Sequence, residues 1–584
     1  MNILSEYKVL LCCAAAVALT SCDDFLDTLP DERVEITTED QVVKLLTTAY
    51  TNGNYGWLCE LSSDNVIDIQ SPYYATQSNG DQIRVYYNLT AYGREDDEAF
   101  RFEPVRSSTS TDSPSMIWEG CYGAIATANH ALEVIERMKQ AGGGTMSPNL
   151  SAAYAEALLS RAFHHFILVN VFSQAWKSDE ASKADRGVPY VTEPEVDLVK
   201  EYSRSTVADT YAKIEADLEE GLKYVSNINY QMPKWHFNVS AAHAFAARFY
   251  LYKRNYEKVI EHANAVLGTD PAVLPSLLMD YSGFDDCTRS TDYAEIWQGP
   301  NEPNNLMLIS TNSVQWRRSI GYRYACAGPA IRDIIMHLGP NWRWYTMPAA
   351  GVGGGTFWDG NQDHGFTSSR IAERFEYSDK VAGIGYPHVI RREFTATELL
   401  LERAEAYLLG RKDLAACEAD LIAYEESRQS FSEKEKAFYT SGGALTPLTH
   451  DMIVRYYRQT TNSNVLPDWN FMQNMDPELV VTDEMLPYMN CINDMRRYEV
   501  AYSGHRFFDL KRWAMPWSHT YGNAERSTTV TLEWDDPRRA IEVPQEVLAA
   551  GMEPSHQPAL EGDNTKSKAT GRYTGTPSLK KQQQ

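Results

Sequence analysis

The chain has 584 residues, of which 43% are hydrophobic and 23% charged, as is ordinary for a globular protein with a large core. Its formal net charge of −25 argues against nucleic-acid binding, which needs a basic surface, and against electrostatic docking on an anionic membrane. The 35 tyrosines and 13 tryptophans are amphipathic aromatics, which suit both cores and recognition surfaces.

The N-terminus is typical of an exported protein. The apolar run from Val9 to Leu19 has the length of a signal-peptide core and is too short to span a bilayer. It leads into Leu19-Thr20-Ser21-Cys22, which resembles a bacterial lipobox. We therefore expect residues 1–21 to be a signal peptide and Cys22 to carry lipid, with ordinary secretory cleavage as the alternative. Several acyl chains on one residue would anchor the protein stably in a membrane.

Residues 22–39 are expected to form a tether. Its acidic start, Asp23–Asp27, resembles the surface-export signal of Bacteroidetes lipoproteins, although a solvated linker would look the same. Beyond the tether we expect one domain over residues 40–560 and a polar, disordered tail over residues 561–584. Six cysteines outside the signal segment and lipid site show no metal-binding spacing, and both disulfides and buried free thiols remain open for them: Cys59, Cys121, Cys287, Cys326, Cys417 and Cys491.

The domain is predicted to be mainly α-helical with a few short strands. Apolar residues recur at three- and four-residue spacing in a series of segments, each typical of an amphipathic helix. Two of the segments, Asn238–Gly268 and Leu399–Tyr424, contain a helix, a short polar turn and a second helix, which is typical of degenerate tetratricopeptide repeats. "RAIEVP" near the C-terminus is strand-like. The other helical segments are Asp40–Tyr50, Met116–Met138, Ala152–Phe172 and Val207–Val225.

Two irregular stretches, about residues 64–102 and 271–387, are rich in aromatic and polar residues. Sugar rings have apolar faces that stack on aromatic planes, and their hydroxyls pair with amides and carboxylates. We therefore expect a ligand-binding aromatic platform in these stretches, whereas Trp118, Trp235 and Trp513 lie in helical contexts and are assigned to packing. The candidate ligand-binding residues are Trp342, Trp344, Trp358, Trp316, Trp297, Asp359 and Asn361, with Tyr73, Tyr74 and Tyr92 from the first stretch.

No motif marks a catalytic or metal site. His164 and His165 are adjacent, so they point to different faces of a helix and make a poor metal pair. "AGVGGGTF" lacks the Gly-Lys-Ser/Thr ending of a phosphate-binding loop. The charged groups near the C-terminus are interpreted as a structural cluster in which arginines and carboxylates pair. We expect no enzyme activity and no cofactor, and calcium binding, although possible, has no support in the sequence. The cluster comprises Glu499, His505, Arg506, Asp509 and Arg512.

Several motifs together resemble one known family. "RRYEVAYSGHRFFDLKRW", Arg496–Trp513, resembles the C-terminal signature of the SusD/RagB family of outer-membrane lipoproteins. "RAFHHFILVNVF" and "RGVPYVTEPE", within Arg161–Glu195, resemble the helix and Val-Pro-Tyr loop of that family. The helix pairs and the lipobox fit as well. The segment "EVPQEVLAAGMEPSHQPA" departs from the family's Asn-Pro-rich ending.

The resemblance implies a SusD-like fold and a function. Four tetratricopeptide-type helix pairs would form the scaffold and the transporter-facing side, and long irregular excursions would form the ligand face. The protein would capture an oligo- or polysaccharide at the cell exterior and deliver it to a SusC-like TonB-dependent transporter in the outer membrane. Capture of a peptide or protein ligand in the same arrangement is the alternative, and the net charge of −25 would favour basic peptides. A glycoside hydrolase is a third hypothesis, which no catalytic motif supports.

Overall fold

The structure is a computed structural model, which describes the domain from residue 36 to residue 555 with internal gaps. The expected signal peptide, Cys22, most of the tether and the polar tail lie outside the described residues. Of residues 73–76, 82–85 and 290 only the backbone is described. The described ranges are 36–70, 73–76, 82–85, 92–106, 110–194, 202–281, 284, 287, 289–319, 323–327, 330, 340, 368–428, 448–459, 465–523 and 525–555.

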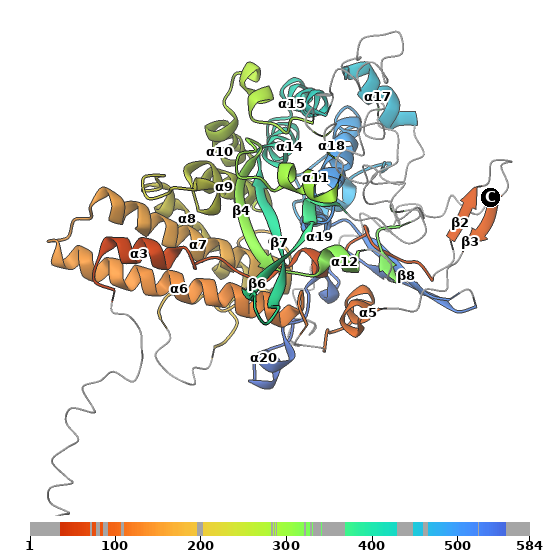
Figure 1. The fold of residues 1–584 in the computed structure, drawn as a ribbon. Coiled ribbons are helices and arrows are strands. Elements are labelled where there is room, and N and C mark those ends of the chain that lie inside the picture. Colours follow the sequence, from red (N-terminus) through yellow and green to blue (C-terminus); the bar gives the residue numbers. More distant parts are fainter. Residues whose placement is uncertain are drawn as a thin grey trace, which may run out of the picture.

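The first half of the domain is a stack of antiparallel helices (Figure 1). Their bounds lie within a few residues of those predicted from periodicity, and local signals explain them. The Ser113 hydroxyl accepts a hydrogen bond from the backbone N–H of Met116, with Pro114 at the first helical position, so α6 begins there. The helices are α3 (Glu39–Leu46), α6 (Pro114–Ala141), α7 (Pro148–Phe172), α8 (Val207–Leu222), α9 (Val239–Tyr252) and α10 (Tyr256–Leu267).

The second half continues this stack through a further repeat-like pair. Helix α14 (Ala396–Ala406) ends in a π-helical turn (Tyr407–Arg411) and is followed by α15 (Leu414–Ser427). Gly410 in that turn lies against Tyr256 of α10, where an added Cβ would come 2.4 Å from the Cβ of Tyr256. Glycine at this position therefore lets the two pairs pack closely. Helices α17 (His450–Gln459), α18 (Leu486–Glu499) and α19 (His505–Arg512) complete the C-terminal part.

A three-stranded antiparallel sheet lies at the centre of the molecule in Figure 1. Its order is β4 (Asn305–Asn312), β7 (Ile384–Thr395) and β6 (Glu373–Asp379), with Ile309 opposite Arg391 and Arg374 opposite His388. The C-terminal half of β7 is buried beside β4 and runs directly into α14. Its N-terminal half pairs with the exposed edge strand β6.

Short elements connect the stack and the sheet. Three two-stranded pairs are β1 (Ile67–Asp68) with β5 (Tyr324–Ala325), β2 (Tyr73–Thr76) with β3 (Gln82–Val85), and β8 (Trp517–Gly522) with β9 (Ser527–Leu532). The short helices are α4 (Gly56–Leu61), α5 (Arg94–Phe100), α11 (Ser290–Trp297), α12 (Gln315–Arg318) and α20 (Gln545–Ala549). None of the helices among the described residues has both the length and the apolar character needed to cross a membrane.

The predicted mainly α-helical architecture is confirmed, with two local corrections. The second irregular stretch contains β4, β6 and the start of β7, so part of it is regular strand. "RAIEVP" is not a strand: it follows a single 3-10 turn, and the backbone N–H of Ile541 donates to the carbonyl of Val171 at the end of α7. Its alternating pattern reflects docking against a helix end rather than pairing in a sheet.

The six remaining cysteines are all free thiols in the structure. Five are buried, and Cys287 is half-buried. Burial raises the pKa of Cys59, Cys121 and Cys326 to about 12, so these thiols stay protonated and behave as small apolar side chains. Of the two alternatives left open by the sequence, the structure shows buried thiols rather than disulfides.

His164 and His165 are both buried in α7 and point to different partners, as their adjacency predicts. Each is held as a neutral ring: Nδ1 donates to a carbonyl one turn earlier, while Nε2 accepts a backbone N–H, from Thr51 for His164 and from Val191 for His165. Burial lowers the pKa of His164 to about 4 and of His165 to about 3. His165 also stacks on Tyr190 at 3.8 Å between ring centroids. Both rings are therefore part of the packing.

The neutral state of His165 makes stability depend on pH. The folded chain binds this proton only near pH 3, whereas the unfolded chain binds it near pH 6.5, so folding stability is present above pH 6.5 and is lost as pH falls. We expect His165→Gln to lower the thermal midpoint at pH 7 and to show a shallower fall between pH 6.5 and pH 4 than wild type. Thermal unfolding in steps across that window tests this, and equal slopes in the two proteins would contradict it.

Candidate ligand-binding face

Most of the predicted platform cannot be placed. Trp342, Trp344, Trp358, Asp359 and Asn361 lie outside the described residues. For Tyr73 and Tyr74 the structure gives only the backbone course in β2, where they pair with Val85 and Arg84 of β3. The expectation that these residues contact ligand therefore stays a prediction.

Trp297 is a correction to the predicted platform. It is the last residue of α11 and its side chain is fully buried. The guanidinium groups of Arg370 and Arg392 lie 4.5 and 4.6 Å from its ring centroid, and Tyr281 packs edge-on against it at 5.7 Å. With charged groups stacked on the indole inside the protein, no surface is left for a ligand. Sequence alone could not separate this buried tryptophan from exposed ones, because its neighbours are as polar as those of a loop.

Trp316 and Tyr92 are accessible. Trp316 lies in α12 and is half-buried against the core, while the next residue, Arg317, forms an ion pair with Glu373 of β6. Tyr92 is 45% exposed, and its ring meets Tyr324 edge-on at 6.1 Å. These two aromatics therefore keep the accessibility that a ligand contact requires.

The β6–β7 hairpin carries the densest group of exposed apolar side chains among the described residues. Phe375 and Tyr377 are 49% and 51% exposed, and their rings meet edge-to-face with centroids 5.0 Å apart. Because side chains alternate along a strand, both project from the same face of β6. Ile384 and Tyr386 of β7 are 60% and 39% exposed, but Tyr386 lies opposite Glu376, so these two side chains project from the other face of the hairpin. We call Phe375 and Tyr377 the hairpin aromatic group.

Glycine at position 385 makes room for this group. In the hairpin register Gly385 lies opposite Tyr377, and Pro387 lies opposite Phe375. A Cβ at position 385 would come 2.0 Å from the carbonyl oxygen of Glu376 and 2.7 Å from the ring of Phe375. The ring of Phe375 therefore covers the backbone of the partner strand, which fixes its position as an exposed surface.

The hairpin aromatic group is joined to Trp316 through α12. Helix α12 packs against β6, and the Arg317–Glu373 ion pair ties the two elements together. Arg318 of the same helix reaches Glu95 and Asp96 of α5. One side of the molecule therefore presents aromatic groups on a hairpin and a short helix, with charged pairs between them. Sequence reasoning missed the hairpin, although the alternation in "ERFEYSD" was a usable signal for an exposed strand.

The arrangement offers binding chemistry. Exposed aromatic faces provide stacking surfaces, and neighbouring amides, carboxylates and guanidinium groups provide hydrogen bonds. Among the described residues no group of three or more His, Cys, Asp or Glu side chains is arranged to hold a metal ion.

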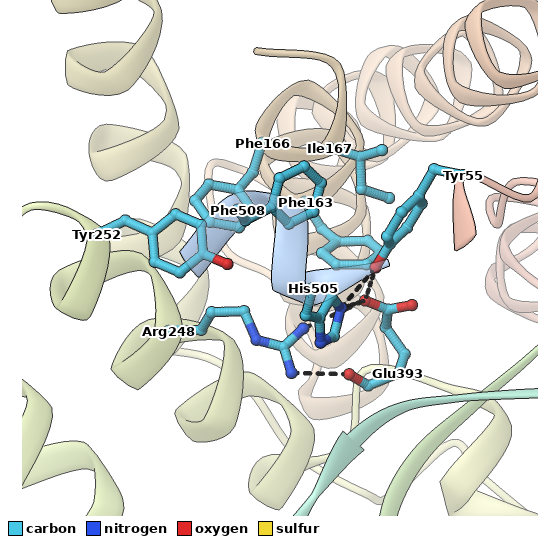
Figure 2. Close-up of a pocket in the computed structure, with 9 residues that line it drawn as sticks. All are labelled: Tyr55, Phe163, Phe166, Ile167, Arg248, Tyr252, Glu393, His505 and Phe508. Carbon is cyan, nitrogen blue, oxygen red and sulfur yellow. Dashed lines mark hydrogen bonds and ion pairs between the residues drawn. The ribbon is translucent and has the colours of Figure 1, made fainter. Parts of the chain in front are cut away.

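The internal gap drawn in Figure 2 is not a ligand site. Its lining side chains come from α7, α9, β7 and α19, together with Tyr55 just before α4; they are buried, and its polar side is already paired. The Tyr55 hydroxyl lies 2.6 Å from Glu393 and 2.9 Å from Nε2 of His505, and Arg248 donates to Glu393 at 3.2 Å. Burial alone would raise the pKa of Glu393, but Arg391 and His505 hold it at about 2.

The charged C-terminal cluster is structural, in agreement with its interpretation from sequence. Asp509 accepts hydrogen bonds from both Arg496 and Arg512, at 3.0 and 2.7 Å. Arg512 also forms a two-pronged pair with Glu405 of α14, and Arg506 forms one with Asp64. Because these groups are buried and satisfy each other, they fasten α18, α19 and α14 together.

Removing one carboxylate from this cluster should be costly. Asp509→Asn leaves two buried guanidinium groups short of a counter-charge, so we expect a loss of about 3–5 kcal/mol in unfolding free energy. Glu257→Gln is the matched control, because Glu257 pairs with Arg411 on the surface, where 64% and 44% of the side chains are exposed. That change should alter stability little. Thermal unfolding of the two variants measures the difference, and equal midpoints would show that the buried cluster is not structural.

Comparison with known proteins finds a matching family model and similar solved structures. Residues 24–251 match a SusD-like family model described as "Starch-binding associating with outer membrane". A SusD superfamily protein from Bacteroides fragilis is similar in structure over 89% of this chain and 99% of its own, with 15% identity and a TM-score of 0.55. Residues 24–251 are therefore similar to the SusD-like family, and the domain shares the SusD-like fold.

Two further SusD-like folds agree over the same extent. A putative sugar-binding protein from Bacteroides vulgatus ATCC 8482 covers 89% of this chain and 99% of its own, with 16% identity and a TM-score of 0.53. A SusD superfamily protein from Bacteroides thetaiotaomicron VPI-5482 covers 89% and 100%, with 16% identity and a TM-score of 0.50. At these identities the structures show the fold alone. A search of curated proteins gave no match.

Proposed function

We propose that this protein is a cell-surface lipoprotein of the SusD/RagB family that binds an oligo- or polysaccharide and passes it to a SusC-like TonB-dependent transporter. It binds its ligand without transforming it. Cys22 carries the lipid that holds it in the outer membrane, and the tether lets the domain face the cell exterior. The helix pairs provide the transporter-facing scaffold, in keeping with the resemblance found in the sequence.

The family match carries this proposal. The family's description combines starch binding with the outer membrane, and one structurally similar protein is described as a putative sugar-binding protein. The accessible aromatic surface supports the same class of ligand. Phe375, Tyr377 and Trp316 offer planes on which the C–H faces of sugar rings can stack.

Binding without chemistry is inferred from the family resemblance. Three carboxylates near the hairpin are engaged in ion pairs: Glu373 pairs with Arg317, and Glu95 and Asp96 pair with Arg318. Glycoside hydrolysis needs an acid and a base facing one bond across several ångströms. On this face the described residues offer stacking surfaces, and Glu373, Glu95 and Asp96 serve as partners for arginines.

The hairpin aromatic group should contribute directly to glycan affinity. Each aromatic contact with an apolar ring face is worth about 0.5–1.5 kcal/mol, so we expect Phe375→Ala/Tyr377→Ala to weaken binding roughly 10- to 100-fold. Calorimetric titration of soluble protein starting at residue 23 against plant, host and microbial polysaccharides measures this. Val381→Ser is the matched control, because Val381 is fully exposed at the tip of the same hairpin and should leave affinity unchanged.

The outcomes separate the ligand classes. Binding of one glycan by wild type, weakened in the double variant while its thermal midpoint is retained, supports both the function and the site. Binding that is unchanged in the double variant keeps the function but moves the site to the residues predicted from sequence, beginning with Trp342 and Trp344. If no polysaccharide binds and basic peptides bind instead, peptide capture replaces the glycan proposal.

A further inference from the structure

Three buried arginines share one carboxylate at the junction of four elements. Arg370 lies in the 3-10 turn before β6, Arg392 in β7 and Arg428 at the end of α15, and all three face Glu499 at the end of α18. Their side chains are 7% exposed or less. Arg428 donates a hydrogen bond to Glu499, whereas Arg370 and Arg392 approach that carboxylate only to 4.0 and 3.9 Å. The group, which we call the arginine triad with Glu499, has a formal excess of positive charge.

A neighbouring charged cluster is arranged differently. There, every guanidinium has a carboxylate within about 3 Å, for example Arg496 with Asp509 at 3.0 Å and Arg248 with Glu398 at 2.9 Å, although Nε of Arg248 and Nη1 of Arg496 have no hydrogen-bond partner among the described residues. Cations and carboxylates are balanced in number in that cluster. The cations are Arg248, Arg391, Arg496, Arg512 and His505, and the carboxylates are Glu393, Glu398, Glu402, Glu405 and Asp509.

Aromatic rings surround the triad but supply no negative charge. Arg370 and Arg392 lie over Trp297, and Arg428 lies 4.8–5.0 Å from the ring centroids of three tyrosines. Such contacts attract a cation by about 0.5–2 kcal/mol each, which reduces the cost of burial without neutralising the charge. The fully buried Trp297, which the sequence suggested as a ligand contact, therefore belongs to this site. The three tyrosines are Tyr281, Tyr424 and Tyr498.

Several N–H groups of the triad are left over. Arg370 uses Nη1 on the carbonyls of Tyr498 and Glu499, at 3.1 and 2.9 Å. Its Nε and Nη2, together with Nη1 of Arg392 and Nε of Arg428, have no hydrogen-bond partner among the residues that the structure describes. A buried N–H without an acceptor costs about 1–3 kcal/mol, and more when it is charged. Unpartnered donors also occur in the balanced cluster, but here four of them coincide with an excess of positive charge, and this combination favours an additional acceptor.

The electrostatics of Arg392 agree with this geometry. Burial, followed by repulsion from Arg370, lowers the pKa of Arg392 to about 9. Burial also lowers the pKa of Arg370. Glu302 raises the pKa of Arg392 through space, and burial raises the pKa of Glu302 itself. An additional negative charge would relieve this repulsion.

We propose that the arginine triad binds a small oxyanion of the sulfate, phosphate or carboxylate class. Planar guanidinium forks match the paired oxygens of such ions, and three of them converging in a buried site favour an oxyanion over a single-atom ion. Burial favours a free ion over an anionic group on a polymer. The ion ties together the 3-10 turn, β7, α15 and α18. Since β7 continues into the exposed hairpin, anion binding stiffens the strand that pairs with β6, which carries the hairpin aromatic group. The site stands independently of the proposed glycan function.

Sulfate and phosphate titrations of the soluble protein, with ionic strength held constant by sodium chloride, test the proposal. We expect the thermal midpoint to rise and then saturate, and calorimetry to show one site per chain. Arg392→Gln should raise the apparent Kd at least tenfold. Glu499→Gln should lower it, because that change removes the carboxylate that competes with the anion. Arg411→Gln, at an exposed ion pair, is the matched control and should respond like wild type.

A further variant and two contradicting outcomes complete the test. If Arg392→Gln fails to fold, Arg370→Lys retains the charge but loses the fork and should weaken binding. A midpoint that rises linearly, by the same amount in wild type and Arg392→Gln, is a general salt effect on burial and would overturn the site. Saturation by glucuronate-containing oligosaccharides with no response to sulfate or phosphate would overturn the free-ion form of the proposal.

Discussion

The pairing of buried charges between α9, β7, α14, α18 and α19 is the interaction on which the rest of this structure depends. Arg248 of α9 reaches Glu393 of β7 and Glu398 of α14, and Asp509 of α19 joins two arginines from α18 and its own helix. Buried ion pairs contribute little net stability, because desolvation offsets their attraction. Breaking one is costly, however, so only one relative placement of these elements satisfies all the groups. This network of buried ion pairs thereby fixes the helix stack against the central sheet.

Strand β7 connects the buried ion pairs to the ligand face. Its buried end carries Arg391, Arg392 and Glu393, whereas its other end pairs with β6, which presents Phe375 and Tyr377. A side chain that must stack on a sugar ring loses less conformational entropy on binding when its strand is already rigid. The division between a packed frame and an exposed binding surface follows from the two ends of one strand. This is why the hairpin is a better candidate for recognition than an unsupported loop.

The helical frame could be predicted from sequence because its signals are local. The apolar spacing and the Ser–Pro starts of α6 and α7 place those helices within a few residues, and the C-terminal motif resembles that of the SusD/RagB family. Burial of a tryptophan is different, because it depends on distant partners. Trp297 is covered by Arg370 and Arg392, which lie more than seventy residues away along the chain.

The pairing of β6 with β7 could not be predicted from the sequence for the same physical reason. The exposed strand β6 shows its alternation over only a few residues, and its partner comes from the following strand. "RAIEVP" shows a similar pattern but docks on the end of α7, because the acceptor it meets there is the carbonyl of Val171. A short alternating pattern specifies an extended backbone, whereas the choice of partner is a tertiary property.

Hydrogen–deuterium exchange of the wild-type protein, with and without a saturating glycan ligand, tests the central claim most directly. If a rigid frame presents its ligand at the hairpin, ligand should increase protection in peptides covering residues 373–389 and 315–318. Protection in α9 and α10 should stay the same. Ligand-induced protection confined to α9 and α10, with the hairpin and α12 unchanged, would contradict the account.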